Sequence, residues 1–534
     1  MAERNVFDEM KMYARFVWGL RSFLQHKLTL QEAEDIVRRR LQEREANFLR
    51  LVEKGVYGYP CSPYLPLLRL AQVELGDVRN MVQAKGLEAT LRALRDAGVY
   101  FSFEEYKGRK EVVRHGKQIN VEPDSFDNPF LRYYYETMTS GTSGAGTRVP
   151  TDLDHLAACT PEVMLGRYAQ GLLHAPIGIW RGTLPDASGL HYVLYAVRMG
   201  NVPRKWFSPF APRDFQPARR FRLASWFIVA AARLYGVPIP RPEPVPLDQA
   251  GIVARWAHEA VREHGCCFIT TNGSMAVRVC IAARELGLDL TGVAFSGGGE
   301  PPSPAKVREL AQVGARAVPS YYFTEAGPVG MSCANPADEN DQHFFKDALA
   351  LIQHARLVPG AEVTVEAFLF TTLLPEAPKI LLNVESDDYG VIERRACGCP
   401  LEAYGFTEHI RHIRSFSKLT SEGVTLVGSE MVHILEDVLP ARFGGSSLSY
   451  QLLEEEDEQG FTRLSLLVSP EIEIADEGQV ISVVLEELRG SSAAADVARA
   501  IWAQAQTLRV KRQKPICTPG GKLLPLHIAQ RGNR

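Results

Sequence analysis

The sequence has no long apolar segment and no excess of charge of either sign. Its longest apolar run, from Leu223 to Ala232, is about half as long as a segment that crosses a bilayer. Lys and Arg together number 60 and Asp and Glu 63, which gives a formal net charge of −3. No general basic excess therefore exists to hold nucleic acid or an anionic membrane. The first residues mix charged and apolar side chains and lack the pattern of a secretory signal peptide.

The cysteine content is low and does not indicate a disulfide framework. Nine cysteines are an odd number in a chain of 534 residues without a secretory signal. We therefore expect a cytoplasmic protein with free thiols, some of them available to a metal. The composition, 46% hydrophobic and 23% charged, is that of a soluble globular protein. A chain of this length is expected to form two or more packed units.

Two well-known catalytic motifs are also missing. The phosphate-binding pattern GxxxxGK[ST] does not occur, which excludes the P-loop NTPases. The hydrolase pattern GxSxG fails because Gly144 and Ala145 follow Ser143. An α/β-hydrolase is therefore disfavoured.

The order of predicted elements indicates an α/β protein with two domains. Residues 1–120 have the periodicity of amphipathic helices. From about Gly265 to Gly330, short apolar strands alternate with helical segments, which predicts a parallel sheet with helices against it. After about Arg414 the pattern is that of a small α+β unit. We predict a large N-terminal α/β domain with packed sheets over 1–413 and a small, mobile C-terminal α+β domain over 414–534.

Three segments carry side chains suited to a nucleotide. The first is a Gly/Ser/Thr loop from Thr139 to Gly146, whose backbone N–H and hydroxyl groups suit a polyphosphate. The second is Ser296–Pro301 (SGGGEP), which follows a predicted strand. The third is Tyr321–Glu325 (YYFTE), where an aromatic ring, a hydroxyl and a carboxylate could contact base, phosphate and Mg²⁺. Taken singly, each segment is equally consistent with an ordinary loop, turn or core strand.

The order of these segments is more informative than any one of them. They are followed by an acidic turn at Asp387–Asp388 and by Lys522 in TPGGK near the C-terminus. This series resembles the adenylate-forming superfamily of acyl-CoA synthetases, adenylation domains and luciferases. Within it the chain looks most like the phenylacetate–CoA ligase branch, which carries Thr where many relatives carry Lys in the loop, here Thr147.

The resemblance implies roles for individual residues. The β- and γ-phosphates of ATP would be held by Thr139, Ser140, Gly141, Thr142, Ser143 and Gly144. The base would lie against Gly298, Gly299, Glu300, Tyr321 and Tyr322, with Tyr321 stacked on it. Thr324 would contact the α-phosphate, Glu325 would hold magnesium and Asp388 would bind the ribose. Arg414 falls near the hinge between the domains, and Lys522 would stabilise the adenylation transition state.

The sequence departs from the family pattern in two places. Glu385-Ser386-Asp387 stands where the family usually has Arg-Thr-Gly before the ribose aspartate. The segment Ile413–Lys418 lacks the glycine and both acids of the usual hinge motif. The second departure bears on whether the small domain can rotate fully.

Four residues could form a metal site. Cys397 and Cys399 make a C-x-C pair, and Cys333 and His343 lie upstream, which is the number of donors that a closed tetrahedral zinc site needs. The spacing is not that of a standard zinc finger, and buried free thiols with a surface histidine are the alternative. Some relatives in the phenylacetate–CoA ligase branch carry a structural zinc in this region, so the resemblance implies one here. His409 and His412 are spare candidates.

The function predicted from the resemblance is AMP-forming activation of a small carboxylic acid by ATP. The acyl group would then pass to an acceptor, with CoA favoured and an amine or a carrier-protein thiol as the alternative. A nucleotide-binding protein without catalytic activity is the alternative of another class. The identity of the acid is not legible.

Overall fold

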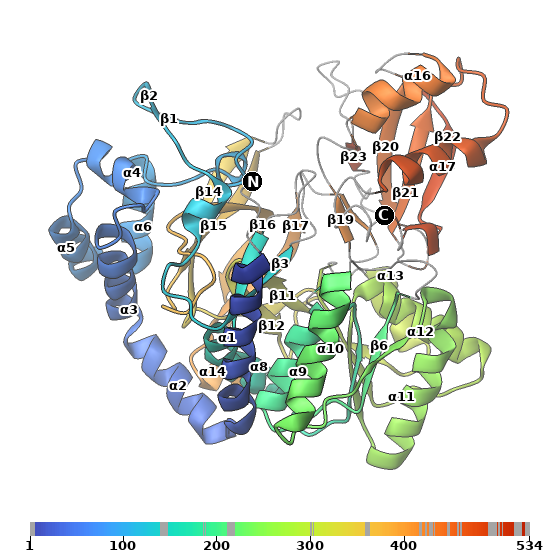
Figure 1. The fold of residues 1–534 in the computed structure, drawn as a ribbon, viewed down its shortest axis with the longest axis horizontal. Helices are drawn as coiled ribbons and strands as arrows, with labels where there is room; N and C mark the ends of the chain where they lie inside the picture. The colour runs from blue at the N-terminus through green and yellow to red at the C-terminus, as the bar shows by residue number, and fades with distance from the viewer. Residues whose placement is uncertain are drawn as a thin grey trace.

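We analysed a computed structural model of the chain. It describes residues 6–138, 148–184, 186, 188–210, 219–299, 302, 304–357, 364–415, 419–421, 424–426, 431, 433–445, 449–456, 459, 462–489, 499, 502–504, 506–516 and 526–528. Figure 1 shows the N-terminal helices on one side of the molecule and the C-terminal segment above the helices α12 and α13 on the other.

The predicted helical start is confirmed. It consists of α1 (Val6–Gln25), α2 (Leu30–Gln42), α3 (Arg44–Leu51), η1 (Val52–Tyr57), α4 (Tyr64–Leu70), α5 (Leu75–Lys85), α6 (Leu87–Asp96) and α7 (Phe103–Tyr106). Thr29 begins α2 with a capping box, in which the Thr29 side chain accepts from the Glu32 N–H and the Glu32 carboxylate accepts from the Thr29 N–H. A short hairpin of β1 (Val112–Arg114) and β2 (Lys117–Ile119) follows, with the 3₁₀ turn η2 (Pro123–Phe126).

A second hairpin introduces the parallel sheet. Strands β3 (Tyr134–Met138) and β4 (Arg148–Asp152) pair antiparallel, with Met138 opposite Arg148. The Gly/Ser/Thr segment connects these two strands in the sequence. Asp152 caps the next helix, α8 (Leu153–Ala169), by accepting from the Asp154 N–H.

The parallel sheet predicted from the strand–helix alternation is present, with strand order β10-β9-β8-β5-β6-β7. Its strands are β5 (Ile177–Trp180), β6 (Lys205–Ser208), β7 (Pro242–Pro244), β8 (Cys267–Thr271), β9 (Val293–Gly297) and β10 (Arg316–Ala317). The helices beside it are α9 (Ser188–Arg198), α10 (Arg219–Leu234), α11 (Ala250–His264), α12 (Gly273–Glu285) and α13 (Pro304–Ala311), with the 3₁₀ turn η3 (Leu247–Gln249) before α11. The alternate prolines near residue 240 contribute the edge strand β7, where a missing N–H is tolerated.

An antiparallel sheet of seven strands completes the large domain, in the order β11-β12-β13-β17-β16-β15-β14. These are β11 (Ser320–Phe323), β12 (Gly327–Ser332), β13 (Gln342–Phe344), β14 (Leu349–Leu357), β15 (Thr364–Thr372), β16 (Val384–Arg394) and β17 (Glu408–Ser415), with α14 (Pro400–Ala403) before β17. The ring of Phe323 on the first strand lies 4.9 Å from that of Phe370 on β15. The sheet therefore curls so that strands distant in its order face each other.

The C-terminal unit has a mixed sheet in the order β22-β21-β20-β23. Its elements are the hairpin β18 (Leu419–Ser421) and β19 (Val424–Leu426), then η4 (Ile434–Val438), α16 (Leu439–Phe443), β20 (Tyr450–Glu456), β21 (Thr462–Val468), α17 (Glu477–Glu487), β22 (Leu508–Arg512) and β23 (Leu526–Ile528). Its buried side chains join those of α11 and α12 in one apolar cluster. No helix of the described residues is long and apolar enough to cross a membrane.

Candidate functional site

Glu325 is a buried carboxylate in the turn between β11 and β12. Lys107, just after α7, places its Nζ 2.8 Å from Glu325 Oε1 in a buried ion pair. Burial alone would raise the pKa of Glu325, but the charge and hydrogen bond of Lys107, with a smaller effect from Lys379, lower it overall. The carboxylate is therefore kept ionised inside the protein.

Cationic side chains also connect this region to the β3–β4 hairpin. Lys379 Nζ lies 2.5 Å from Asp127 Oδ1, and Arg148 of β4 lies 2.7 Å from Asp127 Oδ2. Arg148 also pairs with Glu136 of β3. These contacts join the paired strands β3 and β4 to Asp127 and Lys379.

Tyr321 and Asp388 form a second contact, on the strand that leads into the Glu325 turn. The Tyr321 hydroxyl donates to Asp388 Oδ2 across 2.6 Å, from β11 to β16. Burial and the neighbouring carboxylate raise the pKa of Tyr321 well above its usual value, so the phenol stays protonated. We call Lys107, Tyr321, Glu325 and Asp388 the Glu325 cluster.

The carboxyl edge of the parallel sheet lies next to this cluster. Arg181, directly after β5, donates from Nη2 to the backbone carbonyl of Gly298 across 2.9 Å and to that of Thr271. It thereby ties the ends of β5, β8 and β9 together. Gly299 has φ of +89°, a conformation that glycine adopts without strain. Ligands of open α/β sheets bind at this edge.

The turn after Glu325 packs directly onto α8. A Cβ at Gly327, where φ is +93°, would come within 2.8 Å of His155 Nε2 and 3.2 Å of Cys159 Sγ, so only glycine fits. Burial lowers the pKa of His155 to about 3, and the imidazole is neutral at physiological pH. Tyr322 points to the same side, where its hydroxyl meets that of Tyr195. The Tyr322 side chain therefore faces α8 and α9.

The acidic residues that depart from the family pattern have structural partners. Glu385 accepts from His354 Nε2 across 2.6 Å and from the Phe103 N–H across 3.2 Å, and it pairs with Arg356. The Ser386 hydroxyl accepts from the Asp388 N–H across 3.1 Å, which fixes the turn. The departure is therefore compatible with the position of Asp388 beside Tyr321.

Several predicted site residues lie outside the described residues. They are Thr139, Ser140, Gly141, Thr142, Ser143, Gly144, Glu300 and Lys522. Thr324 is described and lies in the turn before Glu325. Arg414 lies on β17 and pairs with Tyr389 of β16, so the large sheet continues two residues past the predicted boundary at 413.

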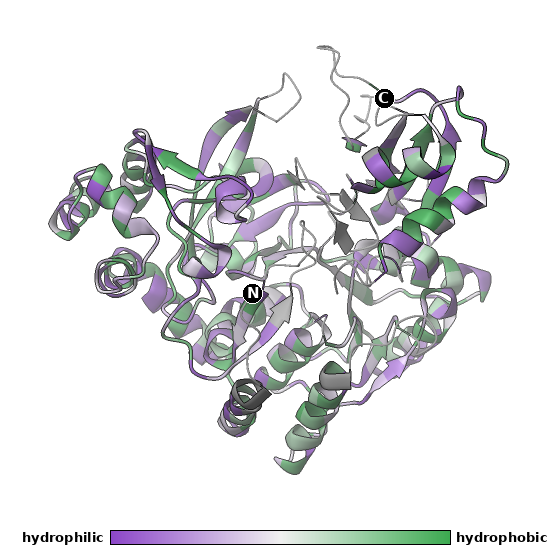
Figure 2. Ribbon diagram, turned by 45° about the horizontal axis from the view of Figure 1, so that its top comes forward, coloured by the Kyte–Doolittle hydropathy of each residue, from purple (hydrophilic) through white to green (hydrophobic). Residues whose placement is uncertain are grey.

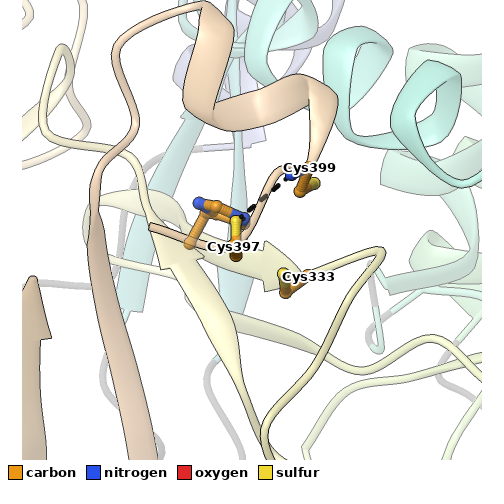
Figure 3. A group of neighbouring side chains, drawn as sticks. Cys333, Cys397 and Cys399 are labelled. Carbon is orange, nitrogen blue, oxygen red and sulfur yellow. Dashed lines mark hydrogen bonds between the residues drawn. The ribbon is translucent and has the colours of Figure 1, made fainter. Parts of the chain in front are cut away.

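The four predicted metal ligands do lie together. One donor atom from each of Cys333, His343, Cys397 and Cys399 is within 4.8 Å of the others. Cys397 Sγ is 3.6 Å from His343 Nε2. A tetrahedral zinc with bonds of about 2.3 Å to sulfur and about 2.0 Å to nitrogen would separate these two atoms by about 3.6 Å. Figure 3 shows Cys333 at the end of a strand opposite Cys397 and Cys399. We call these four residues the Cys/His cluster.

The surroundings of the Cys/His cluster orient its donor atoms. Backbone N–H groups of Asn335, Ala334 and Cys399 donate to the sulfurs of Cys333, Cys399 and Cys397 at 3.3, 3.4 and 3.4 Å. His343 Nδ1 lies 2.7 Å from the Phe406 carbonyl oxygen, so it carries the proton and leaves Nε2 as the donor.

The acidity of Cys399 is consistent with this arrangement. The hydrogen bond from the neighbouring Cys333 thiol lowers the pKa of Cys399, although burial opposes the shift. His409, a spare candidate, instead places Nδ1 2.6 Å from Asp341 Oδ1, and Asp341 also pairs with Arg395. One donor atom from each of Cys333, Asp341 and His409 is also within 4.8 Å of the others, so His409 belongs to a second possible metal group that shares Cys333 with the Cys/His cluster.

Lys107 and Arg181 are site residues that sequence reasoning missed. Lys107 is 218 residues from Glu325, in a charged segment that looks like a solvated surface. Arg181 follows a strand directly, and that position at a parallel-sheet edge is the signal that could have identified it.

Comparison with known proteins supports the fold. A solved complex of 2-hydroxyisobutyryl-CoA ligase with 2-HIB-AMP and CoA matches with a TM-score of 0.53 and 15% identity, over 94% of this chain and 91% of that chain. The amide bond synthetase McbA from Marinactinospora thermotolerans matches over 87% of this chain and 92% of that chain, with a TM-score of 0.42 and 13% identity. No protein-family model and no curated protein sequence matches the chain.

The chain therefore has the two-part α/β fold of the solved 2-hydroxyisobutyryl-CoA ligase. A large N-terminal domain of parallel and antiparallel sheets is followed by a small C-terminal domain with a mixed sheet, as the sequence predicts. At 15% identity the likeness establishes the fold alone.

Proposed function

We propose that the protein is an ATP-dependent, AMP-forming carboxylate ligase of the phenylacetate–CoA ligase-like branch. The Glu325 cluster carries the proposal, because it gathers an ionised carboxylate, an aromatic ring and a second carboxylate beside the carboxyl edge of the parallel sheet. These side chains occupy the motif positions that the resemblance assigns to magnesium, base and ribose.

The chemistry of adenylation suits these groups. Attack of a substrate carboxylate on the α-phosphate of ATP builds negative charge on the phosphate oxygens and releases pyrophosphate. Glu325 would hold the magnesium that accompanies ATP, and Thr324 would donate to the α-phosphate. Tyr321 would stack on the base, Asp388 would accept from the ribose hydroxyls, and Lys522 of the small domain would offset the developing charge.

CoA is the acceptor that we propose for the second half-reaction. The solved 2-hydroxyisobutyryl-CoA ligase, which matches with a TM-score of 0.53, supports this choice. Transfer to an amine or to a carrier-protein thiol is the alternative. Product analysis after incubation with MgATP, the acid and either CoA or an amine distinguishes an acyl-CoA from an amide.

Exchange of labelled pyrophosphate into ATP tests the first half-reaction. We expect exchange that depends on one acid of a broad panel, and we expect Glu325→Gln to abolish it. ATP binding without exchange for any acid would instead favour a nucleotide-binding protein that lacks catalytic activity.

We also propose that the Cys/His cluster holds one structural zinc. The four donors, the 3.6 Å distance between Cys397 Sγ and His343 Nε2, and the oriented Nε2 fit a closed tetrahedral ion. Such an ion would stabilise the fold without taking part in the reaction. It would fix β12 and β16 to each other, and these strands also carry or adjoin Glu325 and Asp388.

A further inference from the structure

Exposed apolar side chains gather on two helices of the large domain. Trp18 of α1 is 78% exposed, and Leu223, Trp226 and Leu234 of α10 are 66%, 64% and 83% exposed. Phe227 of α10 is exposed as well. Single exposed apolar residues are ordinary, but two tryptophans among five such side chains are not. We call these five residues the α1/α10 patch.

Both helices turn an apolar side to the core; α10 also has an apolar side that faces outward, and α1 adds the exposed ring of Trp18. On α1 the buried residues include Phe16 and Leu20, and on α10 they include Ala224 and Ile228. The two helices pack against each other. Figure 1 shows them side by side at the front of the molecule, and Figure 2 shows the hydrophobic colour of α10 at its lower edge. The exposed residues of α10 recur at helical spacing, so they form a continuous outward stripe.

The charges beside this stripe all have one sign. Over 11–25 and 221–234, the parts of α1 and α10 whose side chains are described, the exposed charged residues are Lys11, Arg15, Arg21, Arg222 and Arg233. Neither stretch contains an aspartate or a glutamate. The whole chain, in contrast, has a formal net charge of −3. The basic character is therefore local to α10, which contains no acidic residue, and to the part of α1 after Met10, since the first turn of α1 contains Asp8 and Glu9.

We propose that the α1/α10 patch binds the surface of an anionic lipid bilayer. Tryptophan, leucine and phenylalanine beside arginine are the side chains with which interfacial helices enter the headgroup region. A second copy of the chain is a poor occupant, because a symmetric contact would bring these cationic residues against their own copies. An anionic surface complements both the apolar and the cationic side chains.

The helices would lie in the plane of the membrane. α10 has 16 residues, fewer than a bilayer crossing needs, and no described helix qualifies as a span. The interaction would be reversible, and salt would weaken it because part of the attraction is between charges.

Co-sedimentation with vesicles tests the proposal on the full chain. We expect binding to phosphatidylcholine vesicles that contain one third phosphatidylglycerol, and little binding to phosphatidylcholine alone. The double variant Trp18→Ser and Trp226→Ser should reduce the partition by about tenfold or more, since both rings are lost from the interface. Arg15→Glu with Arg222→Glu should reduce it mainly at low salt.

Val113→Ser and Leu286→Ser are the matched controls, because both side chains are exposed and belong to other elements, Val113 to the hairpin strand β1 and Leu286 to the end of α12. They should bind vesicles like the wild type. Each variant should keep the wild-type melting temperature, since exposed side chains have little packing to lose. Equal binding to neutral and anionic vesicles, or none, would overturn the proposal. A dimer in sedimentation velocity that the tryptophan variant does not form would also overturn it. So would a protein that binds an acidic protein through this patch but does not bind vesicles.

Discussion

The Glu325 cluster and the Cys/His cluster adjoin the same two strands, yet their charges are balanced differently. β12 starts two residues after Glu325 and ends directly before Cys333, while β16 contains Asp388 and ends three residues before Cys397. Glu325 is matched by Lys107 from a distant helix. In the Cys/His cluster three sulfurs lie close together. The cation beside them is Arg395, which donates a hydrogen bond to the Cys333 sulfur.

The difference in charge balance indicates how each site binds its ligand. A carboxylate paired with a lysine is stable when no substrate is bound. It can exchange the lysine for a cation that arrives with the substrate. Four converging soft donors with oriented lone pairs gain their full stability only with a bound metal. We therefore expect a transient ligand at the Glu325 cluster and a permanent one at the Cys/His cluster.

Removal of two cysteines should have the largest effect. Cys397→Ser with Cys399→Ser should reduce zinc from about one per chain to none, and it should destabilise the large domain by several kcal/mol. Elemental analysis of protein purified without added metal and thermal unfolding measure both. Cys61→Ser is the control, because Cys61 is an exposed free thiol. A wild-type protein that contains no metal and is no more stable than the double cysteine variant would show that no zinc is held.

Lys107→Met should destabilise the protein by about 3–5 kcal/mol at neutral pH, because it leaves the Glu325 carboxylate buried without its partner. The pKa of Glu325 is lowered in the folded wild type, so the pair stabilises the fold above the unfolded pKa of about 4.3 and loses this effect as pH falls through the folded value. In the variant, burial without Lys107 would raise the pKa of Glu325, so the carboxyl takes up a proton as pH falls, and the deficit should shrink toward pH 4.

Denaturant unfolding at several pH values measures the Lys107 effect. Lys110→Met, which removes an exposed neighbouring charge, should be close to wild type. Adding Glu325→Gln to Lys107→Met should recover part of the loss. A deficit that stays constant from pH 8 to pH 4 would mean that lost packing, not the ion pair, causes it.

Lys522→Ala should slow adenylation by about 10²–10³-fold, as the loss of one preorganised donor does. Thioester formation from a supplied acyl-adenylate should be nearly unchanged, since that step would use the small domain in its rotated position. Lys514→Ala is the control from the same domain, because Lys514 is exposed and paired with Glu471. Equal loss in both half-reactions would assign Lys522 a structural role.

Tyr321→Phe should have the smallest effect. It removes the hydroxyl that donates to Asp388 but keeps the ring, so we expect a cost of about 1 kcal/mol in stability. The KM for ATP in pyrophosphate exchange should change by less than about tenfold, whereas Tyr321→Ala should raise it more because stacking is lost. Equal KM values for both variants would contradict a stacking role.

Local sequence patterns determined the fold class of this protein and several of its candidate site residues. The helical periodicity of residues 30–54, the strand–helix alternation after Gly265 and the series of segments around Tyr321 predict the fold class, because these features depend on neighbours in the sequence. The four donors of the Cys/His cluster could also be named in advance, since cysteine and histidine are few and chemically distinctive.

Only the tertiary structure decided which distant residues meet. Lys107 reaches Glu325, and Tyr321 reaches Asp388, because the seven-stranded sheet curls and brings α7 and β16 toward β11. Likewise, the sequence shows Trp18 and Trp226 as ordinary members of two helical patterns. Both rings are exposed on helices that contact each other, and no local pattern encodes that contact.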